Sequence, residues 1–178
     1  MTNFSDAECL ANYVKLKELF ASIIPDSQRF NVVYGYGMDV GMMNYVVVRT
    51  TTTTYSSYAI GYNVDEIVII PIDIDLEHYG KPFFLKKDEI KKSEQNRMTK
   101  DWIIWDKQFP KTYIQFIVPD LLNDDEDDED DDDVVLPIKQ EEEAKAFEKL
   151  FKEVYIGKQQ SSNILQDSLQ KVFSIFNK

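Results

Sequence analysis

Cysteine and histidine are almost absent from this chain of 178 residues. Cys9 is the single cysteine, so no disulfide can form within the chain, which is typical of a protein from a reducing compartment. A structural zinc site needs several cysteine or histidine ligands, and Cys9 and His78 are the only two such residues. We therefore expect no zinc site, no cofactor and no catalytic triad, and we interpret His78 as a surface loop residue.

Long apolar runs are also missing. No stretch approaches the roughly 20 apolar residues that a membrane-spanning helix needs. The first residues, Met-Thr-Asn-Phe-Ser-Asp, have neither a basic start nor an apolar core, so the sequence predicts no secretory signal peptide. Together these absences predict a soluble, cytoplasmic protein without stable membrane insertion.

Negative charge is abundant, but most of it lies in one segment. The net charge is −12, from 32 acidic and 20 basic residues, and residues 124–133 are ten consecutive acids. Without that run, 22 acids remain against 20 bases, so the body is nearly neutral. We expect a disordered acidic insertion at 123–133, because like charges at this density repel, and we favour this over a loose cation site. A neutral body with an acidic loop also argues against nucleic-acid binding.

The centre of the chain has the pattern of β-strands joined by short polar turns. Apolar residues alternate with small or polar ones, which is typical of antiparallel strands with one buried face. A polar break at 63–66 predicts a turn, residues 93–100 predict a loop or strand edge, and Pro71 hints at an edge or bulge. About seven strands are expected, at 30–36, 42–49, 58–62, 67–77, 83–85, 102–105 and 113–118.

Amphipathic helices are expected on both sides of the strands. Ser5 and Glu8 have the spacing of a capping box, followed by an apolar stripe that ends before Pro25. This stripe consists of Leu10, Tyr13, Val14, Leu16, Leu19, Phe20, Ile23 and Ile24. A second stripe at 141–155 consists of Ala144, Phe147, Leu150, Phe151 and Val154. The sequence thus predicts an N-terminal helix in 1–26 packed on a β domain of 27–156, and a further helix in 157–178.

This order of strands followed by the helix at 141–155 resembles the pleckstrin-homology-like superfold, especially its bacterial and GRAM-type members, over about residues 30–155. Residues 84–90, Phe-Leu-Lys-Lys-Asp-Glu-Ile, are similar to a step that follows the paired strands in that family. The resemblance implies an α+β, mostly β fold: a seven-stranded antiparallel barrel or sandwich closed by a C-terminal amphipathic helix. The N- and C-terminal helices would be additions. Lipid-binding members use bases in the first hairpin loop, but residues 37–41 contain none and one acid, so we expect no phosphoinositide binding by that route.

Three groups of side chains are candidate sites. Asp73, Asp75 and Glu77 form an i, i+2, i+4 row that could hold a hard cation, although the wet face of a strand is the simpler interpretation. The basic segment, which could contact phosphate, an acidic partner or the acidic run, includes Lys86, Lys87, Lys91, Lys92, Arg97 and Lys100. The third group is the apolar end of the last helix, at Val172, Phe173 and Phe176.

No convergent set of nucleophile, base and orienting group is recognisable. The sequence therefore predicts a non-catalytic binding or scaffold module that engages a protein partner through the barrel groove or the terminal helix. Because soluble monomers tend to avoid large exposed apolar patches, Val172, Phe173 and Phe176 predict a contact between chains, most simply a homodimer. The alternative is an enzyme or cation-binding protein that uses Asp73, Asp75 and Glu77.

Overall fold

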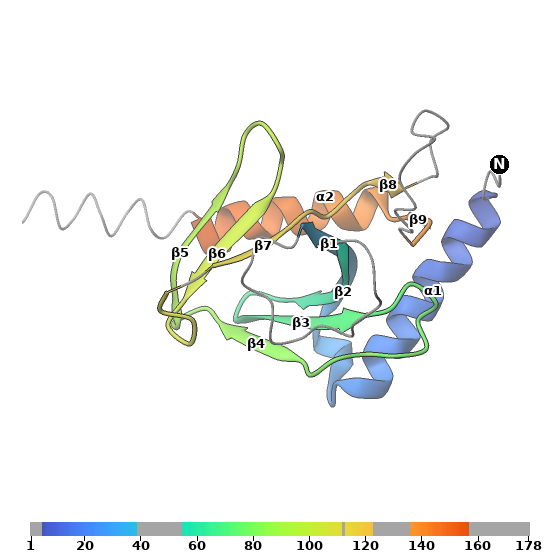
Figure 1. The fold of residues 1–178 in the computed structure, drawn as a ribbon, viewed down its shortest axis with the longest axis horizontal. Helices are drawn as coiled ribbons and strands as arrows, with labels where there is room; N and C mark the ends of the chain where they lie inside the picture. The colour runs from blue at the N-terminus through green and yellow to red at the C-terminus, as the bar shows by residue number, and fades with distance from the viewer. Residues whose placement is uncertain (1–4, 39–54, 112, 123–135, 157–178) are drawn as a thin grey trace, which may run out of the picture.

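The computed structural model describes residues 5–38, 55–111, 113–122 and 136–156 (Figure 1). The loop expected at 37–41 starts later than expected, because Gly37 and Met38 are in a strand that pairs with Ser56 and Tyr55. Its residues 39–41, the strand at 42–49, the acidic insertion and the last helix lie outside these described residues. Those expectations therefore stay predictions.

The described elements form an α+β fold with two main antiparallel sheets and two α-helices. The first sheet has the strand order β1-β2-β3-β4 and the second has the order β5-β6-β7, while β8 and β9 pair separately. The bounds of the strands are β1 Asn31–Met38, β2 Tyr55–Tyr62, β3 Glu66–Ile72, β4 Phe83–Lys86, β5 Ile90–Gln95, β6 Trp102–Asp106, β7 Ile114–Phe116, β8 Leu121–Leu122 and β9 Ile138–Lys139. The helices are α1 Asp6–Ile23, the short 3-10 turn η1 Ser27–Arg29, α2 Glu141–Leu150 and its π-helical continuation η2 Phe151–Ile156.

Seven strands lie between residues 31 and 116 of the described chain, as many as expected, but not all are the expected ones. β5 was not among the expected strands, and its last residues, 93–95, belong to the segment 93–100 that was expected to be a loop or a strand edge. The turn between β2 and β3 is confirmed. Asn63 Oδ1 accepts the backbone N–H groups of Asp65 (2.8 Å) and Glu66 (3.0 Å), a local bond that favours asparagine in turns.

β3 is buried on both faces along its whole length, rather than on one face. The expectation that it alternates as far as residue 77 is wrong, because β3 ends at Ile72 and a turn follows in which Leu76 has a φ of 59°. The carbonyl of Pro71 accepts the N–H of Gly80 (2.8 Å), on the side of β3 that faces away from β2 and beyond the end of β4. The nitrogen of Pro71 faces the same side as its carbonyl, because both groups of a strand residue do. Pro71 therefore removes no hydrogen bond from either ladder, although β3 is an inner strand in regular register with β2 and not the edge or bulge that Pro71 hinted at.

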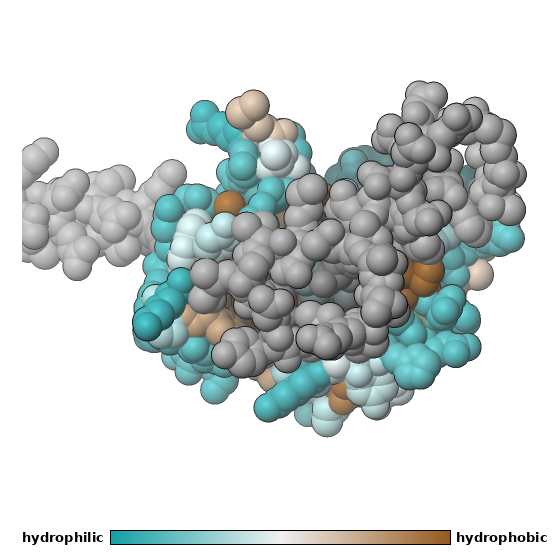
Figure 2. All heavy atoms as spheres, viewed as in Figure 1, coloured by the Kyte–Doolittle hydropathy of each residue, from teal (hydrophilic) through white to brown (hydrophobic). Residues whose placement is uncertain are grey.

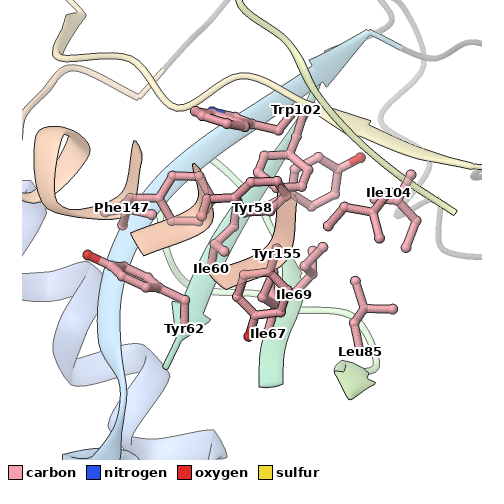
Figure 3. Packing of buried hydrophobic residues seen from close by; sticks show 14 residues of the cluster. Tyr58, Ile60, Tyr62, Ile67, Ile69, Leu85, Trp102, Ile104, Phe147 and Tyr155 are labelled. Atoms are coloured by element: carbon pink, nitrogen blue, oxygen red, sulfur yellow. The ribbon is translucent and has the colours of Figure 1, made fainter. Parts of the chain in front are cut away.

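The main core lies between the two sheets and the helix formed by α2 and η2 (Figure 3). Phe147, Phe151 and Tyr155 project from one side of this helix, with ring centres 5.4 Å and 5.3 Å apart. Trp102 of β6 meets Phe147 edge-on at 5.5 Å. The apolar stripe expected in the second helix is thus confirmed, with Tyr155 added to it by the π-helical turn.

A second core lies on the opposite face of the first sheet, under α1. Ser5 and Glu8 form the expected capping box: the Glu8 N–H donates to Ser5 Oγ (3.3 Å), and the Ser5 N–H donates to Glu8 Oε2 (2.7 Å). The buried side chains of α1 are Cys9, Tyr13, Leu16 and Phe20. Leu10 and Val14, which were counted in the apolar stripe, are 57% and 43% exposed, so the buried stripe is narrower than expected.

The described strands do not close into a barrel. The two sheets join at one corner, where Tyr36 and Ile117 exchange two backbone hydrogen bonds of 2.9 Å and 2.7 Å. At the opposite corner β4 and β5 follow each other along the chain without pairing. Among the described residues, no helix is long and apolar enough to cross a membrane.

Candidate partner-binding site

The three acidic residues expected on one strand face do not share a strand. Asp73, Asp75 and Glu77 all follow β3, in the turn after Ile72. Asp73 Oδ1 accepts the N–H of Glu77 (2.9 Å), and Oδ2 is 2.8 Å from Nδ1 of His78, which is exposed as expected. Partial burial tends to raise the pKa of Asp73, but these bonds outweigh it and lower the pKa. The expectation of a carboxylate row on one strand face is therefore wrong. The described residues contain no group of three or more acidic, histidine or cysteine side chains that could hold a metal.

Sheet edges are the other places where a partner could bind, and the edge of β1 is closed. The N–H of Tyr34 donates to Gln140 Oε1 (2.7 Å), and its carbonyl accepts Gln140 Nε2 (2.9 Å). On either side, Tyr36 pairs with Ile117, and the carbonyl of Val32 accepts the hydroxyl of Tyr13 (2.9 Å). A further strand could pair with β1 only by displacing these groups.

The outer edge of β4 is partly closed in the same manner. Gln108 Nε2 donates to the carbonyl of Phe84 (2.9 Å), in the middle of the strand. Beyond the end of β4, Lys107 Nζ donates to the carbonyl of Asp88 (2.8 Å). Side chains from the loop after β6 thus occupy the corner between the sheets.

β5 differs from both of these strands. It pairs with β6 on one side, and in the part of the chain that the structure describes no strand pairs with its other edge. The helical turn η2 is connected to β5, because Ser93 Oγ donates to the carbonyl of Tyr155 (2.7 Å). An unpaired edge presents backbone donors and acceptors to which a further strand can bond.

The side chains of β5 make this edge selective. Lys92 Nζ lies 2.6 Å from Glu94 Oε2 and 4.5 Å from the centre of the Trp105 ring, on the face away from the core. The pairing register passes from Ile90 to Lys92, so Lys91 is the extra residue of a bulge. Lysines and bulges discourage indiscriminate pairing at a sheet edge. A partner strand must therefore accommodate two exposed positive charges.

Of the six basic candidates, two, Lys91 and Lys92, lie in β5. Lys86 ends β4 opposite Glu66, which forms an ion pair with Arg29. The N–H of Lys87 donates to the carbonyl of Asp65 (2.8 Å), and the Lys87 residue is half-buried. A shallow depression at this place is lined by Asp65, Glu66, Lys86, Lys87 and Asp88. With three acids and two bases it is not a basic surface, so the structure separates this pair from Lys91 and Lys92.

The apolar candidates Val172, Phe173 and Phe176 lie outside the described residues. The contact between chains expected of them stays a prediction.

A groove between α1 and α2 is a second concave surface, which the sequence did not indicate. Burial raises the pKa of Tyr62 to about 12 and also raises the pKa of Tyr13, so both hydroxyls stay protonated at neutral pH. Both already donate to carbonyls within the fold, Tyr13 to Val32 at 2.9 Å and Tyr62 to Glu143 at 3.4 Å. These hydroxyls hold the helices against the sheet, so we rank the groove below the edge of β5 as a binding site.

A buried carboxyl group lies at the base of the β5–β6 pair. Asp106, opposite Ile90, is 1% exposed, and its Oδ1 accepts the N–H of Gln108 (2.7 Å). Its Oδ2 has no hydrogen-bond partner. Burial raises the pKa of this carboxyl group. Nothing in the sequence indicated this burial, because an aspartate is rarely buried without a partner.

Comparisons of the chain with protein-family models, with curated proteins and with solved structures found no match.

Proposed function

We propose that this protein is a non-catalytic binding module whose β5 edge accepts an extended segment of a partner protein. The observation that carries the proposal is the contrast between strand edges. Gln140, Tyr13 and Ile117 occupy the edge of β1, whereas in the described chain no strand occupies that of β5. A strand edge that no other described strand covers is a place where strand addition can occur.

Strand addition would use both the backbone and the alternating side chains of the incoming segment. Main-chain hydrogen bonds to β5 provide affinity, and the side chains on alternate sides provide specificity. One side of the added strand would meet Lys92 and Trp105. The other would meet η2, where Val154 and Ile156 are partly buried against the core.

The resemblance to pleckstrin-homology-like domains supports a binding role. The resemblance implies a seven-stranded barrel or sandwich closed by an amphipathic helix, and the described chain has β1–β7 in two antiparallel sheets with α2 packed against them. We propose that the chain is an elaborated member of this superfold, with α1 as an addition and with the two sheets as its barrel or sandwich. The cytoplasmic location expected from the sequence is part of the same proposal.

We rank the alternative of an enzyme or cation-binding protein below this proposal. It depended on Asp73, Asp75 and Glu77 sharing a strand face, and they lie in a turn instead. Both oxygens of the Asp73 carboxylate bond to residues at the far end of that turn, Glu77 and His78, so this carboxylate holds the loop together.

The test blocks the edge without removing a pair from the β5–β6 ladder. Lys91 is the bulged residue and has no Cα partner on β6, so Lys91→Pro places a ring in the strand there, while Lys91→Ala removes only the charged side chain. Peptides from a synthetic array that bind the wild type should bind Lys91→Ala and lose at least about tenfold in affinity for Lys91→Pro. Circular dichroism would establish that both variants are folded.

Hydrogen exchange locates the bound peptide independently. Binding at the edge should protect the backbone amides of β5 from exchange. Protection confined to the groove between α1 and α2, with the amides of β5 unchanged, would contradict the proposal.

A further inference from the structure

The groove between α1 and α2 offers apolar surface and space. The buried side chains of Phe20, Phe30 and Val32 line it, and the exposed residues Ala21 and Ala146 add only small side chains. Its volume of about 470 Å³ is within the range of roughly 300–1,000 Å³ that is usual for ligand-binding pockets, so several side chains of a docked segment fit in it. The two tyrosine hydroxyls at the groove already donate to carbonyls, so an apolar occupant leaves neither of them without a partner.

The charges that line this groove are mainly negative. Glu142 and Glu143 belong to α2, and Lys17 of α1 is the one base among the described residues that line the groove. An occupant with apolar side chains and a small excess of positive charge therefore complements it.

One face of α2 leads from the groove towards the point where the described chain ends. Glu142, Ala146 and Lys149 follow one another at the spacing of a single helix face. Leu150, and Ile156 at the end of η2, are hydrophobic residues that are only partly buried. Figure 1 shows α2 and η2 running across the molecule, from the side of α1 to the opposite side. A segment that follows Ile156 can therefore return to the groove along the helix that precedes it.

The sequence after Ile156 has the composition that complements the groove. Residues 157–178 lie outside the described residues, and the sequence predicts a helix there. Within 163–178 there are two bases, Lys171 and Lys178, against one acid, Asp167. The apolar residues at helical spacing are Leu165, Leu169, Val172, Phe173 and Phe176.

We propose that the groove between α1 and α2 binds residues 163–178 of the same chain. The segment turns at 157–162, runs antiparallel to α2 and places Val172, Phe173 and Phe176 in the groove.

The lengths of the two segments agree with this arrangement. Ala146 lies ten residues before Ile156, which corresponds to about 15 Å at roughly 1.5 Å per residue of helix. A helix that starts beside Ile156 at residue 163 covers the same distance in ten residues, so Phe173 reaches the level of Ala146. The connection at 157–162 has a usual length for two helices that pack against each other.

A segment of the same chain has an advantage over a second copy. The short connection keeps it close to the groove, at an effective concentration on the order of millimolar. A second copy reaches such a concentration only in a concentrated solution. The contact of Val172, Phe173 and Phe176 is then made within one chain, in place of the contact between chains that the sequence predicts.

The β5–β6 hairpin does not suit this segment. The hairpin projects from the body in Figure 1, and its surface is largely hydrophilic in Figure 2. Its exposed bases include Lys91, Arg97 and Lys100, whereas the segment itself has an excess of bases. Both its polarity and its charge therefore favour the groove over the hairpin.

Cysteine pairs in the full chain test where the segment lies. Ala146→Cys with Phe173→Cys should form a disulfide under mild oxidation, because two cysteines can join only when their Cα atoms are within about 7 Å. The bridge should lie within one chain, so the oxidised protein should run as a monomer on a non-reducing gel. The loss of free thiols measures the rate.

The matched control is Ala11→Cys with Phe173→Cys. Ala11 is exposed on α1 and does not line the groove, and Cys9, which is 1% exposed, is common to both variants. The pair in the groove should form its bridge at least about tenfold faster than the control pair.

A larger side chain in the groove provides an independent test. The long side chain of Ala146→Arg should occupy the groove and release the segment. Backbone amides of residues 165–176 should then exchange hydrogen at least about tenfold faster than in the wild type. Ala11→Arg, the same substitution at an exposed position outside the groove, should leave their exchange unchanged. Circular dichroism would establish that both variants are folded.

Several results would overturn this inference. Equal rates for the two cysteine pairs, or linked dimers in place of the bridge within one chain, would show that the segment does not dock in its own groove. Exchange at 165–176 that is as fast in the wild type as in Ala146→Arg would show the same. None of these results concerns β5, so the proposed function and this inference can fail separately.

Discussion

Gln140 is the residue whose side chain connects the start of α2 to the edge of β1. It is 1% exposed and makes three hydrogen bonds, with the N–H of Tyr34 (2.7 Å), the carbonyl of Tyr34 (2.9 Å) and the carbonyl of Pro119 (2.8 Å). Gln140→Ala leaves buried backbone groups without partners, each at a cost of about 1–3 kcal/mol. We expect the free energy of unfolding, measured in urea, to fall by about 3 kcal/mol in total.

Gln108→Ala is the matched control for this change. Gln108 also donates to a strand-edge carbonyl, that of Phe84, but its side chain is exposed and water can replace it. A loss below about 1 kcal/mol is expected. Equal losses for the two variants would show that burial of the amide is not the cause.

Asp106 should make the stability of the fold depend on pH, because its carboxyl group is buried and its Oδ2 has no hydrogen-bond partner. Burial raises its pKa in the folded state, so its contribution to stability is present below the unfolded pKa of about 4 and is lost as pH rises through the folded value. Asp106→Asn keeps an oxygen for the N–H of Gln108 and cannot ionise. At pH 7 it should unfold at a higher temperature than the wild type, by on the order of 1 kcal/mol in stability, and the gain should disappear near pH 4. A gain that is the same at both pH values would contradict this account.

The packing of α1 on the first sheet depends on the absence of a side chain at Gly61 of β2. A Cβ atom at Gly61 would overlap the ring of Phe20, which is fully buried on the sheet. Gly61→Ala should therefore destabilise the protein by about 1–3 kcal/mol, although alanine suits a strand better than glycine does. Chemical denaturation measures the loss.

The double variant Gly61→Ala with Phe20→Leu identifies the cause of that loss. The smaller leucine leaves room for the added methyl group, so the two changes together should cost less than the sum of each alone. Additive losses would show that α1 is not displaced by the clash.

The whole molecule should tolerate removal of its acidic insertion. Leu122 of β8 pairs with Ile138 of β9, so the ends of the intervening segment are already close together, and Leu136 is buried. Deleting residues 123–133 removes ten acids that repel one another. We expect an equal or higher melting temperature at low salt, and a large loss of stability would show that the insertion packs on the body.

The sequence by itself determined the features that depend on neighbouring residues. Ser5 and Glu8 specify the start of α1 because both bonds of the capping box span three residues, and Asn63 specifies the turn after β2 for the same reason. The apolar stripe of the second helix and the short aromatic strand β6 were predicted too, because local periodicity decides which side chains are buried together.

Tertiary structure decided the features that depend on residues far apart in the chain. β3 is buried on both faces because α1 and α2 cover opposite sides of it, which the alternation of its own side chains could not show. Likewise, the edge of β1 is closed by Gln140, more than a hundred residues away, whereas among the described strands β5 pairs only with β6. Lys91 and Lys92 were predicted as candidates from their charge, but their place on β5, which among the described strands pairs only with β6, depends on how the sheets assemble.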